Sequence, residues 1–209
     1  CLYVLEKLKH YDDYVKSGTY AAQSRFSNFD LPFFELAGKT WGIVGMGNIG
    51  RKVAQIAAAF GCRVIFYSVT GKSSCTDYER VDFDTLLAES DVLSLHCPLS
   101  DLTRHLINKE ALKKMKSSAV LVNVARGPVI CDEDLYEALV EGEIAGAGLD
   151  VQETEPPEET NPLYTMDHVL LTPHMGWKGL ETRQRLVSIL ADNIKQFMEG
   201  NPINVVSGL

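Results

Sequence analysis

The sequence predicts an α/β fold, in which a doubly wound parallel sheet carries helices on both faces. Two observations lead to this prediction. Short apolar runs typical of buried strands alternate with helical patterns along nearly the whole chain. The run from Ala119 to Val124 is almost entirely apolar, which is expected of a strand that is covered on both faces.

The first 37 residues are expected to precede the sheet. The early leucines fall on one face of a helical pattern that continues to Tyr14 and ends by Gly18. Residues 19–37 mix aromatic and polar side chains, and we expect them to form a connection across the surface of the domain.

Strands and helices then follow in regular order. We expect strands at 40–45, 63–67, 91–95, 119–124, 144–149 and 169–171. We expect helices at 49–60, 83–89, 109–115, 133–141 and 178–199. Asp82, Asn108 and Asp132 are placed to begin three of these helices, and Gly142 and Gly200 are placed to close two of them.

The composition is that of an ordinary globular protein and argues against several other classes. Of the 209 residues, 45% are hydrophobic and 23% are charged, which fits one large domain. The formal charge of −8 argues against nucleic acid or an anionic membrane as a partner. No apolar run approaches the ~20 residues of a membrane span, and the charged residues near the start argue against a signal peptide.

The five cysteines are scattered without a CxxC pair, so neither a disulfide framework nor a metal site is predicted. We expect most of them to be small core residues in a reducing compartment, with the cytoplasm as the default location. The chain begins with Cys1 rather than methionine, and inside a helical pattern, so it could be a piece of a longer protein.

A glycine-rich turn, Gly45-Met46-Gly47-Asn48-Ile49-Gly50, joins the first strand to the next helix. Gly45 permits a tight turn, Gly47 lets a pyrophosphate approach the backbone, and Gly50 lets helix and strand pack closely. The start of the helix adds free N–H groups and the positive end of its dipole. Because a strand, a turn, a helix and a second strand follow in the required order, we predict a dinucleotide site rather than an ordinary glycine turn.

Polar residues also follow the other predicted strands, at the edge where ligands of such sheets bind. The residues are His96-Cys97-Pro98, Ala125-Arg126-Gly127, Asp150, Glu155 and His174. This set suits the reduction of a 2-oxo acid by a nicotinamide. His174 would protonate the carbonyl oxygen, Glu155 would orient the imidazole and raise its pKa, and Arg126 would bind the substrate carboxylate. Asp150 would accept a hydrogen bond from the nicotinamide carboxamide.

Each of these residues also has an ordinary structural interpretation. His174 could be a loop histidine, Arg126 could bond a helix end, and Asp150 could cap a turn. Glu155 could belong to a solvated acidic run, because several glutamates surround it. His96 is a rival acid, but we expect it to structure its loop near the adenosine. The conjunction at the strand ends favours the functional interpretation.

Five stretches of the chain resemble the NAD-binding domain of the D-isomer-specific 2-hydroxyacid dehydrogenases. They are LAGKTWGIVGMGNIG (36–50), DVLSLHCPLSDLTRHLIN (91–108), VLVNVARGPVI (120–130), GAGLDVQETEPP (146–157) and TPHMGW (172–177). The resemblance implies a Rossmann fold that binds NAD and a catalytic set of Arg126, Glu155 and His174. The cofactor-binding residues expected from the motifs and the resemblance are Gly45, Gly47, Asn48, Ile49, Gly50, Ser68, His96, Cys97, Pro98, Thr103, Val124, Ala125, Arg126, Asp150, His174 and Gly176.

We expect four parts along the chain. They are an interdomain-type helix at 1–18, a connecting segment at 19–37, a dinucleotide-binding Rossmann domain at 38–177, and a C-terminal helix and tail at 178–209. The family's amino-terminal substrate domain is missing from this sequence. The expectation is therefore a domain that binds cofactor and turns over poorly by itself.

Within the family, the chain looks most like the glycerate dehydrogenases, also called hydroxypyruvate reductases. The similar stretches are YDDYVKSGTY (11–20), NFDLPFFELAGKT (28–40), and Trp177 with ETRQRL (181–186). The expected reaction transfers hydride between NAD(H) and D-glycerate or hydroxypyruvate. Two alternatives stay open: another dehydrogenase of the family, acting on phosphoglycerate, lactate or formate, and a non-catalytic NAD(H)-sensing scaffold like the related co-repressors.

The cofactor and the oligomeric state are expectations of the same kind. Ser68 stands where the family has an acidic residue after the second strand, and Lys72 follows in the same loop, so NAD is expected but NADP is not excluded. A homodimer is expected from the resemblance and from the four phenylalanines of segment 26–34, which a lone domain would expose. The alternative is that these rings pack within the chain. The expected substrate is a small 2-oxo or 2-hydroxy acid.

Overall fold

The computed structural model describes residues 1–206 and divides into two compact units, Cys1–Pro173 and His174–Leu209. The centre of the first unit is a seven-stranded sheet in which every strand pair is parallel. The strands are β1 (Thr40–Val44), β2 (Arg63–Tyr67), β3 (Glu79–Arg80), β4 (Val92–Leu95), β5 (Val120–Asn123), β6 (Gly146–Leu149) and β7 (Val169–Leu171). Their order, β3-β2-β1-β4-β5-β6-β7, winds outward from β1 in both directions and confirms the predicted fold class.

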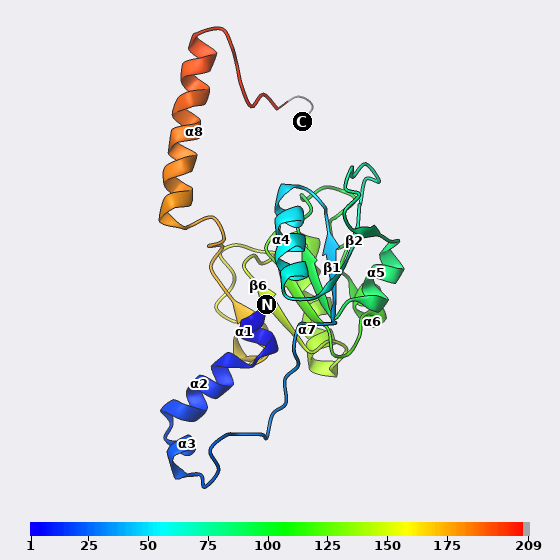
Figure 1. Cartoon of the computed structure of the whole chain (residues 1–209), viewed down its shortest axis with the longest axis vertical. Helices are drawn as coiled ribbons and strands as arrows, with labels where there is room; N and C mark the ends of the chain where they lie inside the picture. Colours follow the sequence, from blue (N-terminus) through cyan, green and yellow to red (C-terminus); the bar gives the residue numbers. More distant parts are fainter. Residues whose placement is uncertain (207–209) are drawn as a thin grey trace. The chain divides into compact units, whose positions relative to one another are not determined.

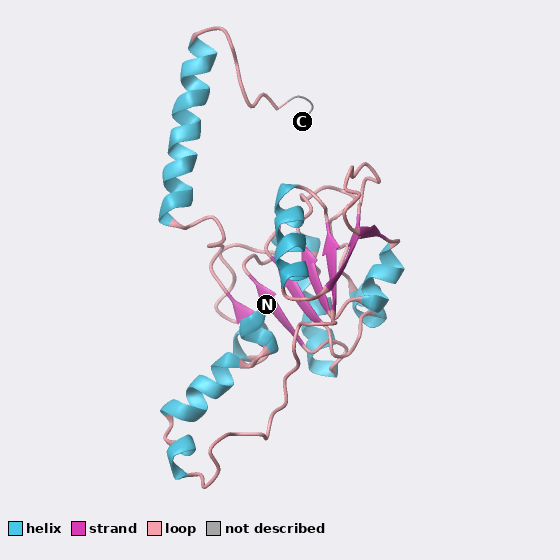
Figure 2. Cartoon of the chain, viewed as in Figure 1, coloured by secondary structure: helices cyan, strands magenta, loops and turns pink. Residues whose placement is uncertain are grey.

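Helices cover both faces of this sheet (Figures 1 and 2). One face carries α4 (Asn48–Ala59), which packs on β1 and β2, and α1 (Leu2–Leu5), which packs on β6 and β7. The other face carries α5 (Phe83–Glu89), α6 (Lys109–Lys114) and α7 (Asp132–Glu141). Each helix presents one apolar side to the sheet, as the helical periodicity predicts.

Alternate residues of each strand supply two separate apolar cores. In β1, Ile43 belongs to the cluster under α4, whereas its neighbour Val44 belongs to the cluster under α5, α6 and α7. In β2, Phe66 and Ile65 divide in the same way, and all four side chains are fully buried. The period of two along a strand therefore explains why these strands are apolar throughout rather than alternating.

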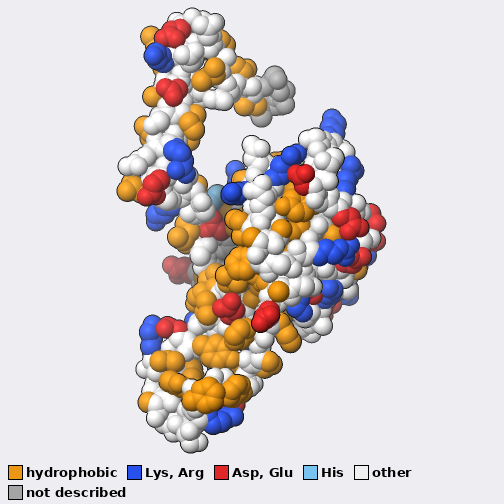
Figure 3. Space-filling view, in the orientation of Figure 1, with side chains coloured by type: hydrophobic (Ala, Val, Ile, Leu, Met, Phe, Trp, Pro, Cys, Tyr) orange, Lys and Arg blue, Asp and Glu red, His pale blue; other side chains and the backbone are white. Residues whose placement is uncertain are grey.

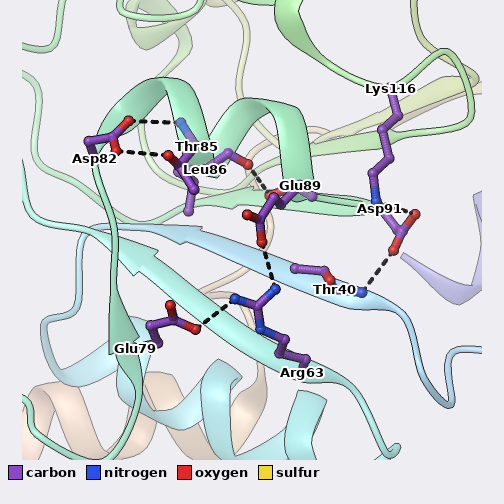
Figure 4. A network of polar contacts seen from close by, with 10 residues as sticks. Thr40, Arg63, Glu79, Asp82, Thr85, Leu86, Glu89, Asp91 and Lys116 are labelled. Atoms are coloured by element: carbon purple, nitrogen blue, oxygen red, sulfur yellow. Dashed lines mark hydrogen bonds and ion pairs between the residues drawn. The ribbon is translucent and has the colours of Figure 1, made fainter.

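The sequence pattern does not predict β3, which forms one edge of the sheet. It has only two residues, Glu79 and Arg80, and both are exposed. Arg63, at the start of β2, pairs with Glu79 and with Glu89 of α5, each at 2.6 Å (Figure 4). A strand this short and polar lacks the alternation by which strands are recognised.

A second polar contact holds the amino ends of β1 and β4. Asp91, just before β4, accepts a hydrogen bond from the Thr40 N–H at 2.8 Å and pairs with Lys116 at 3.0 Å (Figure 4). Burial alone would raise the pKa of Asp91, but the Thr40 hydrogen bond and the Lys116 pair together lower it below its usual value. The carboxylate therefore stays charged and links two central strands.

Two of the three predicted helix starts are confirmed. The side chains of Asp82 and Asn108 accept hydrogen bonds from backbone N–H groups three residues later, at 2.8 and 3.1 Å. The third prediction is wrong, because Asp132 is the first residue of α7 and Cys131 occupies the cap position. The Asp132 carboxylate instead accepts from the Glu153 N–H at 3.1 Å, so a long-range partner takes the oxygen that would have capped the helix.

The predicted helix over the first residues is interrupted. α1 ends at Leu5, and α2 (Leu8–Lys16) begins after Lys7, whose φ of 52° is left-handed. α1 packs on the sheet through Val4, whose side chain lies beside Gly146, whereas α2 has no buried residue. The chain turns away from the sheet at this point, so one continuous helix does not form. A short third helix, α3 (Thr19–Ala22), follows.

The aromatic segment 26–34 lies on the surface. Phe26, Phe29, Phe33 and Phe34 are each at least half exposed, so the rings are not packed inside the first unit. Figure 3 shows hydrophobic side chains gathered on the surface of this amino-terminal part. The nearest ring contacts are among the segment's own neighbours, such as Tyr11 with Phe33 at 6.3 Å between ring centres.

Within the described residues of the second unit, the structure has one long helix, α8 (Leu180–Met198). It begins two residues after the predicted start, and Gly200, with φ of 78°, follows its end as predicted. Within residues 1–206, no helix is both long enough and apolar enough to span a membrane.

Gly42 in β1 provides a test of the packing. A Cβ at Gly42 would lie 2.0 Å from Ser90 Oγ and 3.2 Å from Leu86 Cδ1, whereas a Cβ at Gly148 in β6 would have no neighbour closer than 3.9 Å. We expect Gly42→Ala to lower the free energy of unfolding by about 1–3 kcal/mol, because the buried side chains of Ser90 and Leu86 must shift. The matched control Gly148→Ala should stay within about 1 kcal/mol of the parent. Urea unfolding measures both, and equal stability of the two variants would contradict the described packing.

Candidate active site

The glycine turn after β1 combines tight packing with one open position. Gly45 has a φ of 93°, and a Cβ there would lie 2.8 Å from the Cys97 nitrogen. A Cβ at Gly50 would lie 2.2 Å from the Gly45 carbonyl oxygen. At Gly47, by contrast, an added Cβ would meet nothing within 4 Å. The backbone is thus closely packed on its inner side and accessible at Gly47, which is the geometry that a pyrophosphate requires.

The helix that follows this turn adds donors at the same place. α4 starts at Asn48, and among the described residues no side chain caps its first turn. Its first N–H groups therefore point toward solvent or a ligand, with the positive end of the helix dipole behind them. Asn48 and Ile49 are both exposed on this turn. An anionic group fits this site by charge and by available space.

The loop after β4 is structured by buried polar contacts. Ser94 Oγ accepts a hydrogen bond from Trp41 Nε1 at 2.9 Å and lies 3.1 Å from His96 Nε2. His96 Nδ1 is buried and has no hydrogen-bond partner among the described residues. Burial lowers the pKa of His96 from 6.5 to about 4, so the imidazole is neutral at pH 7.

Two further residues of this loop have structural contacts. The Thr103 hydroxyl donates to the Pro98 carbonyl at 2.8 Å and accepts from the Ser100 N–H at 2.8 Å, and the side chain is almost fully buried. Burial also raises the pKa of the Cys97 thiol to about 11, which keeps it protonated. Thr103 and Cys97 thus shape the loop, while Pro98 is its exposed member.

The loop after β5 presents Arg126 on a fixed turn. Asn123 is fully buried; its Oδ1 accepts from the Ala125 N–H at 3.0 Å and its Nδ2 donates to the Arg126 carbonyl at 3.0 Å. The Arg126 guanidinium donates to the Ala125 carbonyl at 2.8 Å, and the side chain is exposed. Val124 is also exposed, which is unusual for an apolar residue at the end of a central strand.

The loops after β5 and β6 touch each other. A Cβ at Gly127 would lie 1.7 Å from the Gln152 carbonyl oxygen, so only glycine permits this approach. On the β6 side, the Gln152 N–H donates to Glu155 Oε1 at 3.0 Å. The contact thereby brings the loop that carries Arg126 against the loop that carries Glu155, and Glu155 is exposed.

A polar cluster that the sequence does not predict anchors the same loop. Glu153 Oε1 lies 2.6 Å from His105 Nε2, and Glu153 Oε2 accepts from the Asp132 N–H at 3.3 Å. The Glu153 N–H in turn donates to the Asp132 carboxylate at 3.1 Å. Burial raises the pKa of Asp132. Glu153 is thus a structural residue, although it lies within the acidic stretch of the sequence.

The remaining predicted residues lie at the ends of β2, β6 and β7. Ser68, after β2, is buried, and the Ser73 N–H approaches its Oγ at 3.4 Å. Asp150, after β6, is buried and accepts from the Thr172 hydroxyl at 2.6 Å. Thr172 follows β7, so this hydrogen bond ties the carboxyl ends of β6 and β7 together.

The sequence-predicted residues fall into the two units. Those up to Glu155 lie in the first unit, where Arg126 and Glu155 come together through their loops. His174 and Gly176 belong to the second unit, which begins at His174. His174 has a left-handed φ of 49°, a backbone conformation uncommon for a residue other than glycine.

A hollow of about 410 Å³ lies at the opposite edge of the sheet. Its walls include Val4 and Phe33, together with the amino ends of β5 and β7 at Val120 and Val169. Ligands of doubly wound sheets bind outside the carboxyl ends of the strands. The hollow is therefore separate from the candidate active site.

Comparison with known proteins identifies the family. Residues 1–176 match the family described as "D-isomer specific 2-hydroxyacid dehydrogenase, NAD binding domain". A hydroxypyruvate reductase from Blautia hydrogenotrophica is 39% identical over 99% of this chain and 65% of its own length. A glycerate dehydrogenase from Methylorubrum extorquens is 40% identical over 94% of this chain and 62% of its own length. The chain thus spans slightly less than two thirds of these relatives.

Solved structures agree with this assignment. An acyclic imino acid reductase in complex with NADPH and D-Arg has a TM-score of 0.88 and 33% identity, over 99% of this chain and 64% of that one. D-lactate dehydrogenase with NAD⁺ from Lactobacillus jensenii has a TM-score of 0.86 and 31% identity, over 100% of this chain and 66% of that one. On its sequence, its sheet order and these relatives, the chain belongs to the NAD-binding domain family of the D-isomer-specific 2-hydroxyacid dehydrogenases.

Proposed function

We propose that this chain is the nucleotide-binding and catalytic-residue part of an oxidoreductase. The enzyme transfers hydride between a nicotinamide cofactor and a small D-2-hydroxy or 2-oxo acid, with D-glycerate and hydroxypyruvate as the substrate pair. The observation that carries the proposal is the contact of Gly127 with Gln152, which places the Arg126 and Glu155 loops together at the edge that holds the open glycine turn. The names of the two relatives above support the substrate assignment.

The substrate could also be glyoxylate. A glyoxylate reductase from Thermococcus litoralis is 42% identical over 99% of this chain and 63% of its own length. Glyoxylate and hydroxypyruvate share the 2-oxo acid group that Arg126 would bind, and they differ only in the substituent on the reacting carbon. We therefore propose that Arg126 binds the carboxylate of either acid. Kinetics with hydroxypyruvate and with glyoxylate distinguish the two substrates.

Three side chains divide the chemistry in this proposal. The planar guanidinium of Arg126 binds the substrate carboxylate and polarises the carbonyl. His174 gives a proton to the carbonyl oxygen, and Glu155 orients its ring. A bound nicotinamide supplies or accepts the hydride. His96 is unsuited to the role of the acid, because its lowered pKa leaves it neutral at pH 7.

The cofactor contacts are proposed at the positions that the sequence predicts. Gly47 and the first N–H groups of α4 would hold the pyrophosphate. The exposed side chains of Ile49 and Val124 provide apolar surface along the cofactor, and Asp150 lies on the nicotinamide side. The domain division in this proposal assigns residues 38–177 to the dinucleotide-binding domain, after the helix 1–18 and the connection 19–37, and residues 178–209 to a C-terminal helix and tail.

A homodimer in the cytoplasm completes the proposal. The exposed phenylalanines of segment 26–34 support the dimer, because an isolated surface rarely presents so many aromatic rings together. A non-catalytic NAD(H) sensor is the competing function, and it predicts cofactor binding without turnover.

Variants of the three residues test the catalytic assignment. They are made in an enzyme that carries this chain behind an amino-terminal domain of the relatives' kind. We expect His174→Gln to lower kcat by about 10²-fold or more while the Kd of the cofactor stays nearly unchanged, because a general acid is lost. Arg126→Lys should raise KM, because the bidentate contact is lost. Steady-state kinetics with hydroxypyruvate and glyoxylate, together with calorimetry, measure these effects.

Glu158→Gln is the matched control, since Glu158 is an exposed glutamate three residues after Glu155. It should leave kcat unchanged, while Glu155→Gln lowers kcat, because His174 loses the carboxylate proposed to orient its ring. Retained turnover in His174→Gln would place the acid elsewhere. Tight cofactor binding by the parent enzyme without turnover of any 2-oxo acid would favour the sensor.

The pKa of His96 gives a separate prediction. Its pKa is about 4 in the folded chain and 6.5 in the unfolded chain, so the unfolded state takes up a proton first as the pH falls. The part of the free energy of unfolding that depends on neutral His96 is therefore lost as the pH falls from about 6.5 to about 4. His96→Gln should reduce this loss in urea unfolding, whereas His10→Gln on the exposed helix α2 should not. An imidazole NMR titration of His96 near pH 6.5 would refute the buried, neutral state.

A further inference from the structure

The loop between β2 and β3 lies next to the glycine turn and carries many hydroxyl groups. Residues 68–74, Ser-Val-Thr-Gly-Lys-Ser-Ser, contain no acidic side chain, and the first carboxylate after β2 is Asp77. In doubly wound folds, a carboxylate at the end of this strand binds the ribose 2′-OH of NAD and repels a 2′-phosphate. Here the position holds Ser68, which is buried and uncharged.

Arg51 connects this loop to the glycine turn. It belongs to the first turn of α4, and its Nη2 donates to Ser74 Oγ at 3.0 Å. Its Nε approaches the Met46 carbonyl at 3.4 Å. The guanidinium therefore lies between the glycine-rich turn and the loop after β2. A ligand whose pyrophosphate rests on Gly47 would bring its adenosine ribose close to this charge.

A second guanidinium is fixed on the same loop. Arg80 in β3 donates from Nη1 to the Gly71 carbonyl at 2.9 Å, and Lys72 is the exposed residue that follows Gly71. Within residues 1–206, no carboxylate pairs with Arg51, Lys72 or Arg80. Among residues 1–206, Lys72 within the loop and the two arginines bonded to it thus have no carboxylate partner.

Arg63 provides the contrast within the same strand pair. It lies at the other end of β2, and Glu79 and Glu89 pair with it at 2.6 Å each. Near the predicted ribose, no described carboxylate pairs with the cations, whereas at the opposite end of the strand the arginine charge is neutralised. Unpaired arginines beside hydroxyl groups have the donors that a phosphate dianion requires.

We propose that the loop 68–74 binds the 2′-phosphate of NADP(H), and that Arg51, Lys72 and Arg80 make the chain prefer NADPH to NADH. The proposal rests on the dinucleotide site proposed above and specifies its cofactor. The guanidinium groups of Arg51 and Arg80 contact the phosphate oxygens, Lys72 adds a third positive charge, and the hydroxyls of Ser73 and Ser74 lie within the same loop. Because Ser68 is uncharged, no carboxylate at the end of β2 repels the 2′-phosphate.

Calorimetric titration of the 209-residue chain with NADPH and with NADH tests the preference. We expect the Kd of NADPH to be lower than that of NADH by about ten-fold or more, since charged hydrogen bonds are made only to the phosphate. The difference should shrink as the salt concentration rises. In Lys72→Ala/Arg80→Ala, the Kd of NADPH should rise about ten-fold or more while that of NADH stays the same.

Lys52→Ala is the matched control, because Lys52 is an exposed cation next to Arg51 on α4. This variant should leave the Kd of NADPH and the Kd of NADH unchanged. Equal binding of the two cofactors by the parent chain, or equal weakening of both in the double variant, would overturn the proposed preference and leave the dinucleotide site in place. Binding of neither cofactor would overturn the dinucleotide site itself and the preference with it.

Discussion

The close approach of two backbones at Gly127 and Gln152 is the constraint on which the candidate active site depends. A single added carbon at Gly127 would lie 1.7 Å from the Gln152 oxygen, so this contact leaves no room for a side chain at residue 127. Arg126 stands immediately before this contact, and the Gln152 N–H binds the Glu155 carboxylate. Two residues of opposite charge, 29 positions apart in the sequence, are thereby held at one edge of the sheet by a contact between main chains. Side-chain attraction alone would not fix exposed groups this well.

The same loop shows how residues of one chemical type acquire different roles. Glu153 and Glu155 are separated by one residue. The Glu153 carboxylate bonds His105 and the backbone at the start of α7, and these contacts fix the loop. Glu155 bonds the backbone of its own loop and is exposed at the strand ends. In the candidate site, the contacts of Glu153 fix the loop on which Glu155 is held.

Local patterns predict the fold well, and they predict long-range contacts poorly. The apolar runs give the six longer strands, and side-chain caps at Asp82 and Asn108 are visible because donor and acceptor lie three residues apart. The role of Asp132 is missed because its partner Glu153 lies 21 residues away, and His105 is missed because Glu153 lies 48 residues away. The interruption at Lys7 depends on where α1 meets the sheet, and no local signal marks that point. In the site, the residues after each strand can be chosen from sequence because a parallel sheet gathers its carboxyl ends, whereas the contact of Gly127 with Gln152 requires coordinates.

The two-residue strand β3 has a consequence for whether a further strand can be added to the sheet. A sheet edge exposes unpaired main-chain groups, and long, flat edges recruit further strands and lead to aggregation. Here the border is short and carries Glu79 and Arg80, both exposed, with Arg63 and Glu89 nearby. The short length of β3 and its exposed charged side chains both disfavour the addition of another strand at this edge. Association by continuous extension of the sheet is therefore disfavoured on this side.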